Sequence, residues 1–109
     1  MKSHRLIDQR SLAFDRLIAS RLRENPALVQ KAHANLKRWL KTASPGARQT
    51  LREWQSVLDG PLEALLAVLE SDDERATRLR QSSPFCGVLS AAERLDLLKQ
   101  FQQHDARTA

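Results

Sequence analysis

The apolar positions of this chain recur at steps of three and four residues, and no segment alternates strictly between apolar and polar residues. This spacing is the period of an amphipathic helix and not that of a half-buried strand. Glycine, proline and capping residues interrupt the pattern at regular intervals. The sequence therefore predicts an all-α protein, a single-domain bundle of five to six helices over residues 1–109, with frayed ends at 1–4 and 104–109.

The first two predicted helices meet at Asn25-Pro26. Asn25 is expected to cap the second helix, and Pro26 to fill its first position, where a missing N–H costs nothing. The first helix runs from about Arg5 to Glu24, with an apolar stripe made of Ile7, Phe14, Leu17, Ile18 and Leu22. The second is the most clearly amphipathic segment, and its stripe contains Leu28, Ala32, Leu36, Trp39 and Leu40.

Capping residues and prolines likewise divide the rest of the chain into helices. Ser44-Pro45 starts a third helix whose inward residues are Ala47, Leu51, Trp54 and Leu58. The fourth, Leu62 to about Glu70, is apolar on more than one face and is expected to be central. Ser71–Glu74 and Ser90–Glu93 have the sequence of capping boxes and predict a short fifth helix and a last helix. The last helix, ending near Gln103, carries an apolar face made of Leu95, Leu98 and Phe101.

Charge is divided lengthwise. Residues 1–58 hold 12 Lys and Arg against 4 Asp and Glu, whereas residues 59–109 hold 6 against 9. Concentrated charge of one sign repels itself in a compact state and is most useful when a partner neutralises it. The pattern favours a binding protein over an enzyme.

The inventory of reactive residues excludes several classes of function. A lone cysteine, Cys86, rules out an internal disulfide, and three histidines without helical spacing predict no metal site. Cys86 has no histidine nearby to serve as its base, so no catalytic residue and no cofactor are predicted. No segment has the ~18 apolar residues of a membrane span and no secretion leader is present, so we expect a cytoplasmic protein without membrane contact.

The basic surface of the second and third helices is the first candidate site. It would contact nucleic acid or an acidic partner through Lys31, Lys37, Arg38, Lys41, Arg48 and Arg52. The alternative is a solvated face that only keeps the protein soluble. A helix-turn-helix is a further alternative, although the turn Thr42–Gly46 is long for one and few residues beyond Arg48, Gln49 and Arg52 could read base edges.

The segment around Pro84 is the second candidate site. A loop that carries phenylalanine, valine and leucine must either tuck them under the domain or present them to another chain. In the second case, the partner-binding residues would be Arg80, Ser82, Ser83, Pro84, Phe85, Val88 and Leu89. Trp39 and Trp54 lie within apolar stripes and are expected to anchor the core.

Three strings carry a resemblance to a known group of proteins. They are His33–Trp39, Glu53-Trp54 followed by Leu58–Leu62, and Leu79–Ser90, and the last is the most specific. Together they resemble short bacterial antitoxins of toxin–antitoxin operons over about residues 10–102.

The resemblance implies a non-enzymatic protein that neutralises a cognate toxin of nucleotidyltransferase or ribonuclease type by covering it. The acidic segment Asp59–Asp73 could block a basic groove of such a toxin. The basic first half departs from this picture and suits an acidic toxin surface or operator DNA. The alternative function is therefore a helical DNA-binding regulator of its own operon, and a homodimer is a further option.

Overall fold

The computed structural model describes the backbone of residues 2–108 and the side chains of residues 9–101. Its elements are α1 (Lys2–Glu24), the 3-10 turn η1 (Pro26–Leu28), α2 (Val29–Leu40), α3 (Pro45–Asp59), α4 (Leu62–Glu70), α5 (Glu74–Arg80) and α6 (Ala91–Thr108). No strand occurs between residues 2 and 108, so the prediction of an all-α single-domain bundle is confirmed. The outer helices are longer than predicted, and Met1 and Ala109 lie outside the described residues.

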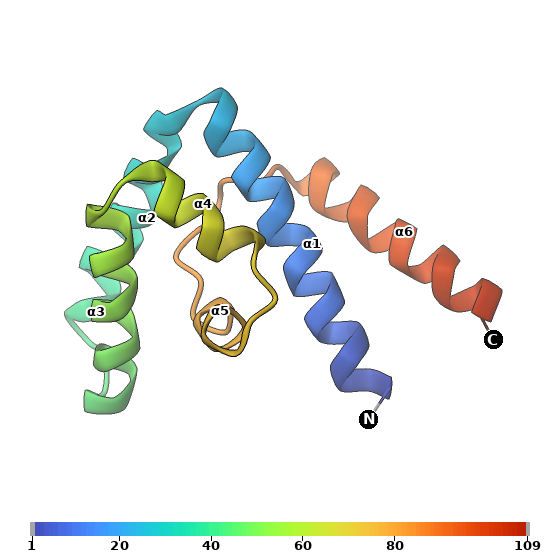
Figure 1. The fold of residues 1–109 in the computed structure, drawn as a ribbon, viewed down its shortest axis with the longest axis horizontal. Helices are drawn as coiled ribbons and strands as arrows, with labels where there is room; N and C mark the ends of the chain where they lie inside the picture. The colour runs from blue at the N-terminus through green and yellow to red at the C-terminus, as the bar shows by residue number, and fades with distance from the viewer. Residues whose placement is uncertain (1, 109) are drawn as a thin grey trace.

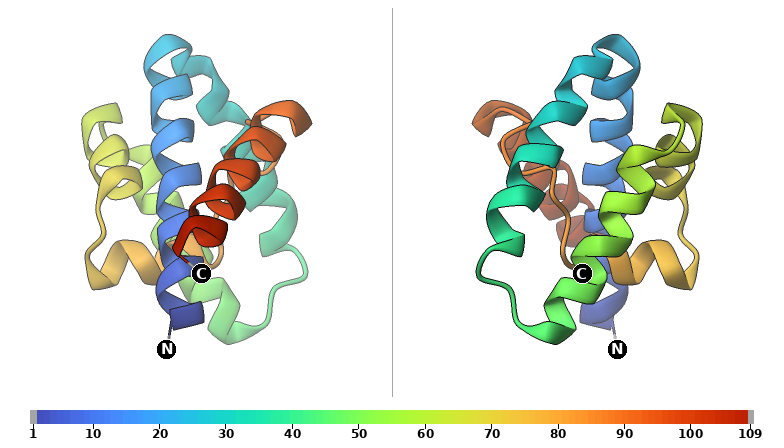
Figure 2. Two further views of the ribbon diagram at one scale, coloured as in Figure 1. Left: turned by 90° about the vertical axis from the view of Figure 1, so that its right-hand side faces the viewer. Right: turned by 90° about the vertical axis from the view of Figure 1, so that its left-hand side faces the viewer.

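The long helix α1 organises the bundle (Figure 1). It contacts α4, α5 and α6, whereas α2 and α3 pair with each other as a helical hairpin at the far side. The views in Figure 2 show α1 between α4 and α5 on one side and α6 on the other. Helix α4 packs against α1, α3 and α5. Glu63, Ala64 and Ala67 are exposed, however, so α4 is covered on only part of its surface and is less central than predicted.

Two of the predicted helix starts have the expected hydrogen bonds. The Ser44 hydroxyl accepts a bond from the Ala47 amide at 3.3 Å, and Pro45 follows it at the first helical position. Ser90 and Glu93 form a reciprocal capping box, in which each side chain accepts from the other residue's amide, at 3.1 and 3.0 Å. Both devices satisfy amides that a helix start otherwise leaves unpaired.

The other two predicted helix starts are wrong in detail. The Asn25 side chain makes no capping bond, because the chain passes through η1 before α2 begins. Helix α5 is capped by Asp73, whose carboxylate accepts from the Ala76 amide at 2.7 Å, while the Ser71 hydroxyl accepts from the Asp73 amide. This capping bond is the main cause that lowers the pKa of Asp73. The acidic run at Asp72–Glu74 therefore starts a helix, as the sequence predicted. The capping residue is Asp73 and not Ser71.

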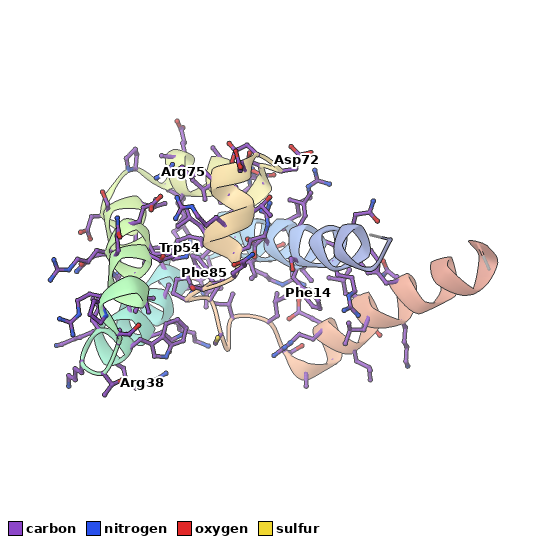
Figure 3. All side chains as sticks on the ribbon, turned by 90° about the horizontal axis from the view of Figure 1, so that it is seen from below. Phe14, Arg38, Trp54, Asp72, Arg75 and Phe85 are labelled. Atoms are coloured by element: carbon purple, nitrogen blue, oxygen red, sulfur yellow. The ribbon has the colours of Figure 1, made fainter. Side chains whose placement is uncertain are left out.

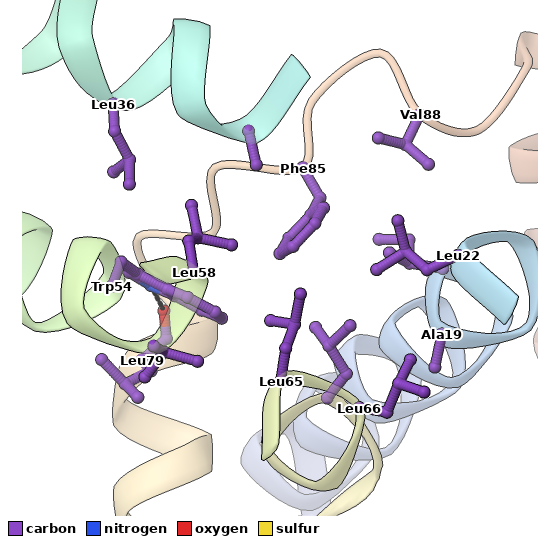
Figure 4. Packing of buried hydrophobic residues seen from close by; sticks show 14 of the residues in the cluster. Ala19, Leu22, Leu36, Trp54, Leu58, Leu65, Leu66, Leu79, Phe85 and Val88 are labelled. Carbon is purple, nitrogen blue, oxygen red and sulfur yellow. Dashed lines mark hydrogen bonds between the residues drawn. The ribbon is translucent and has the colours of Figure 1, made fainter. Parts of the chain in front are cut away.

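Trp54 is the largest side chain of the core and is fully buried (Figure 4). Its indole Nε1 donates to the Leu79 carbonyl at 2.8 Å, so burial leaves no polar atom unsatisfied. The ring meets Phe85 edge to face, with 5.9 Å between centroids. Trp39 is half-buried and packs against the edge of the same core. Both tryptophans contribute to the core, as predicted.

Helix α6 differs most from its predicted packing. Leu95 is 53% exposed, and Leu98 is half-buried. Of the predicted face, only Phe101 lines the groove between α6 and α1, where its apolar neighbours are Leu12, Ala13 and Leu97. Ala47, predicted to face inward on α3, is also exposed, because the first turn of α3 projects beyond the core. Within residues 2–108 no helix combines the length and apolarity needed to cross a membrane.

Candidate functional site

The loop between α5 and α6 is tucked into the protein. Pro84, Phe85, Val88 and Leu89 are all buried, and Phe85 is only 3% exposed. Figure 4 shows Phe85 pointing into the core between α2, α3 and α4. Fully burying such a side chain stabilises the fold by about 1.5–3 kcal/mol relative to leaving it exposed. The prediction that these residues are presented to a partner is therefore wrong for this state of the protein.

The polar residues predicted to join them are also used internally. The Arg80 side chain is 5% exposed, and its Nη2 donates to the Ser71 carbonyl at 2.6 Å. Ser82 and Ser83 are half-buried, and the Ser83 hydroxyl accepts from the Phe85 amide at 3.4 Å. Within residues 82–89, only Cys86 and Gly87 at the turn of the loop are exposed.

Helix α2 holds this loop in place. The buried Asn35 amide donates to the Pro84 carbonyl at 2.8 Å and to the Cys86 carbonyl at 3.3 Å. Lys31 donates to the Gly87 carbonyl at 3.2 Å, next to a backbone turn that glycine makes with φ of 85°. The loop thus exchanges its hydrogen bonds to water for bonds to α2, which allows its apolar side chains to be buried.

The outer surface of the α2–α3 hairpin carries all six predicted contact residues. Lys31, Lys37, Arg38, Lys41, Arg48 and Arg52 are exposed. Residues 25–52 contain no aspartate or glutamate, so this stretch has no carboxylate of its own to neutralise them. None of the six forms an ion pair with a described side chain. The hairpin is therefore a surface of unneutralised positive charge.

Three of these cations have an internal role in addition to their exposure. Arg38 donates to the Asn35 side-chain oxygen at 2.7 Å and so orients the amide that binds the loop. Arg48 reaches back to the carbonyls of Leu40 and Ala43, both at 3.4 Å, across the turn of the hairpin. Lys31 binds Gly87, as described above. Lys37, Lys41 and Arg52 make no hydrogen bond to the described residues and are free to meet a partner.

A groove runs along the hairpin between the two helices. Its volume is about 550 Å³, and its lining consists of His33, Leu36, Lys37, Leu40, Lys41 and Gln55. Lys37 and Lys41 are one helical turn apart, so their ammonium groups stand on the same edge of this groove. Figure 3 shows Arg38 projecting from the same hairpin, away from the core residues Trp54 and Phe85. Apolar floor and basic edges together suit a partner that is both acidic and partly apolar.

Elsewhere the cations are more often paired. Arg75 and Arg78 both bond to Glu53 on α3, at 3.1 and 2.9 Å. The Arg78 hydrogen bond is the main cause that lowers the pKa of the Glu53 carboxyl. Arg21 likewise pairs with Glu93, and Arg23 with Glu70. Because these pairs neutralise the faces around α4 and α5, positive charge is concentrated on the hairpin.

No cluster of potential metal ligands is found among the described residues. No group of three or more His, Cys, Asp or Glu side chains between residues 9 and 101 converges on one point. Cys86 is exposed, and its thiol lies 3.9 Å from the Ser83 carbonyl. A carbonyl accepts a hydrogen bond but does not remove a proton, so this contact does not activate the thiol.

Two residues that organise these sites were not singled out from the sequence. Asn35 lies on the apolar stripe of α2, and Asp15 lies on the apolar stripe of α1 between Phe14 and Ile18. A polar residue on the buried face of a helix is the available signal, because it must find a partner when it leaves water.

The comparisons with known proteins return no match: no family model, no curated protein and no solved structure matches this chain.

Proposed function

We propose that this protein is a non-enzymatic binding module of the antitoxin kind, acting in the cytoplasm, and that it covers an acidic surface of a cognate toxin with its α2–α3 hairpin. The observation that carries the proposal is the run of residues 25–52 in the hairpin, which contains no aspartate or glutamate and exposes six cations. The class of partner comes from the resemblance to antitoxins. The hairpin replaces the loop at residues 82–89 as the contact surface, since the apolar side chains of that loop are buried.

Electrostatics supports this choice of surface. Like charges that lack internal partners repel each other in the free protein, and an acidic partner removes that cost. Complementary charge also raises the rate of encounter and suppresses binding to basic surfaces. The groove beside Lys37 and Lys41 adds apolar area at Leu36 and Leu40, which a purely charged surface would lack.

The test is co-expression with the product of the adjacent open reading frame. Wild-type protein should form a complex and restore growth. The double variant Lys37→Glu with Lys41→Glu should lose both, because it reverses charge at the edge of the groove. Arg16→Glu with Lys99→Glu makes the same change in net charge on exposed residues of α1 and α6 and should behave as wild type. Equal binding by the two double variants, or no complex with the wild type, would refute the proposal.

The second candidate function is DNA binding, and one observation favours it independently. Arg48, Gln49 and Arg52 are exposed on the first two turns of α3, where a helix-turn-helix protein reads the major groove. A salt titration of duplex binding tests it, since each neutralised phosphate contributes a slope of about −0.9 to log K against log salt. In the Lys37→Glu, Lys41→Glu variant that slope should become shallower by the contribution of roughly two phosphate contacts. A slope near zero in the wild type would reject DNA binding, and binding of a protein partner would then be the remaining candidate function.

A further inference from the structure

A second pocket lies on the opposite side of the Pro84–Leu89 loop from the hairpin, between α1, the end of α5 and the start of α6. Its volume is about 270 Å³. Apolar side chains form much of its wall, namely Phe14, Ile18, Phe85 and Leu89, and two serine hydroxyls, of Ser11 and Ser83, also line it. Figure 3 shows Phe14 directed toward the space between α1 and α6. The size is near the lower end of small-molecule sites, which hold ~300–1,000 Å³.

The charged groups of this pocket are incompletely satisfied. Asp15 and Arg80 line it, and their side chains are 6% and 5% exposed. Asp15 Oδ2 and Arg80 Nη1 lie 3.7 Å apart, too far for a hydrogen bond, and neither atom has another hydrogen-bond partner among the described residues. Buried polar atoms without partners are costly, and a bound polar group that reaches both would remove that cost.

The third charged residue stands at the rim. Arg94 lines the pocket from the first turn of α6, is exposed, and makes no ion pair with the described side chains. Two guanidinium groups and one carboxyl leave the pocket with an excess of positive charge. Guanidinium groups remain charged at all physiological pH values and match a carboxylate in shape.

We propose that this pocket binds a small aliphatic or aromatic carboxylate, with its charged head held by Arg80 and Arg94 and its apolar body against Phe14, Phe85 and Leu89. This site is separate from the surface assigned to the macromolecular partner. A carboxylate is favoured over a phosphate because the walls are largely apolar and supply only two cations.

The protonation of Asp15 is coupled to such a ligand. Burial raises the pKa of Asp15 to about 7, and this effect outweighs the opposing influence of Arg80. Arg80 from α5 is the charged group that acts on Asp15. Arg94 from α6 and Cys86 from the loop line the same pocket, and Glu70 of α4 pairs with Arg23. A protonated Asp15 releases Arg80 to an incoming anion and can itself donate a hydrogen bond to it. Binding should therefore weaken as pH rises through about 7.

Calorimetry with hexanoate as the probe tests the proposal on the full chain. Hexanoate should bind saturably, whereas hexan-1-ol, with the same body and no charge, should bind at least about tenfold more weakly, since a charge-assisted bond contributes about 1.5–3 kcal/mol. Inorganic phosphate should not bind in the same range. If Asp15 must be protonated, hexanoate affinity should fall about tenfold from pH 6 to pH 8, over which hexanoate itself stays ionised.

Two variants and a control locate the site. Arg94→Met changes an exposed residue and should weaken hexanoate binding about tenfold, while Lys99→Met, further along α6 and outside the pocket, should not. Asp15→Asn should bind hexanoate with no dependence on pH between 6 and 8. No saturable binding of hexanoate, equal affinity for hexan-1-ol, or unchanged affinity in Arg94→Met would each overturn the proposal.

Discussion

Asn35 determines how the loop after α5 is used. Its amide group bonds to two carbonyls of the loop, those of Pro84 and Cys86, and Arg38 holds it in that orientation. A residue far away in sequence thus supports the loop that places Phe85 in the core. The sequence allows both a buried and an exposed loop at residues 82–89. It does not show which carbonyls the side chain of Asn35 will reach.

Replacing Asn35 should therefore loosen the loop. We expect Asn35→Ala to lower the free energy of unfolding by about 1–3 kcal/mol, because the carbonyls of Pro84 and Cys86 lose their donor and the first of these bonds is buried. Urea denaturation would measure this, with Lys37→Ala on the exposed face of α2 as a control that changes stability by less than about 0.5 kcal/mol. If the two alanine variants were equally stable, the loop would not depend on this clamp.

At the level of elements, the helix starts of α3 and α6 are well predicted, whereas the outer ends of α1 and α6 are not. Ser44-Pro45 and the Ser90–Glu93 box start helices where the sequence places them, because the capping bond is made within four residues. The prediction for α5 is wrong by two residues since Ser71 and Asp73 can both cap, and only geometry decides between them. The packing of α6 could not be predicted, because its apolar residues lie on more than one face and the sequence does not say which of these faces meets another helix.

Helix α6 depends on its cap more than the other helices do. It packs mainly on α1, and Leu95 faces solvent, so fewer tertiary contacts support it. Ser90→Ala should cost α6 about 1 kcal/mol and speed hydrogen exchange of its amides roughly fivefold. Amides of α4 should exchange at unchanged rates, and the exposed substitution Ser56→Ala on α3 is the matched control. Uniform acceleration across all helices would show that α6 does not open independently.

At the scale of the whole molecule, charge is sorted by face. The basic hairpin was predictable from sequence, because exposed positions of an amphipathic helix follow from its period. The Asp15–Arg80 pair was not, although Asp15 occupies an apolar stripe, because its partner is contributed by α5. Pairing across helices thus neutralises cations around α4 and α5, whereas the six cations of the hairpin stay unpaired among the described residues.

The stability of the protein should depend on pH in a way that reflects this arrangement. The folded-state pKa of Asp15 is about 7 and its ordinary value 3.8, so the native state binds the proton more tightly. The stability contributed by Asp15 therefore decreases as pH rises from about 4 through 7 and levels off once the carboxyl is fully ionised. The lowered pKa values of Glu53, Asp73 and Glu93 act in the opposite direction, but only as pH falls through the acidic range below 4.5.

Urea denaturation of wild type and Asp15→Asn between pH 5.5 and pH 8 isolates the effect of Asp15. The wild type should lose stability with rising pH relative to the variant, whose amide does not titrate. His33 and the other ionisable groups are common to both proteins and cancel in the difference. A difference that stays constant over this range would contradict the assigned pKa.

The two tryptophans offer separate optical reporters of these events, because the chain contains no tyrosine. Trp54 is fully enclosed, so in a Trp39→Phe protein its emission should lie at short wavelength and move to the red only on global unfolding. Trp39 sits half-covered near the turn of the hairpin, so in a Trp54→Phe protein its fluorescence should respond when a macromolecule settles on Lys37 and Lys41. One indole thus monitors folding and the other monitors association, each without an added dye.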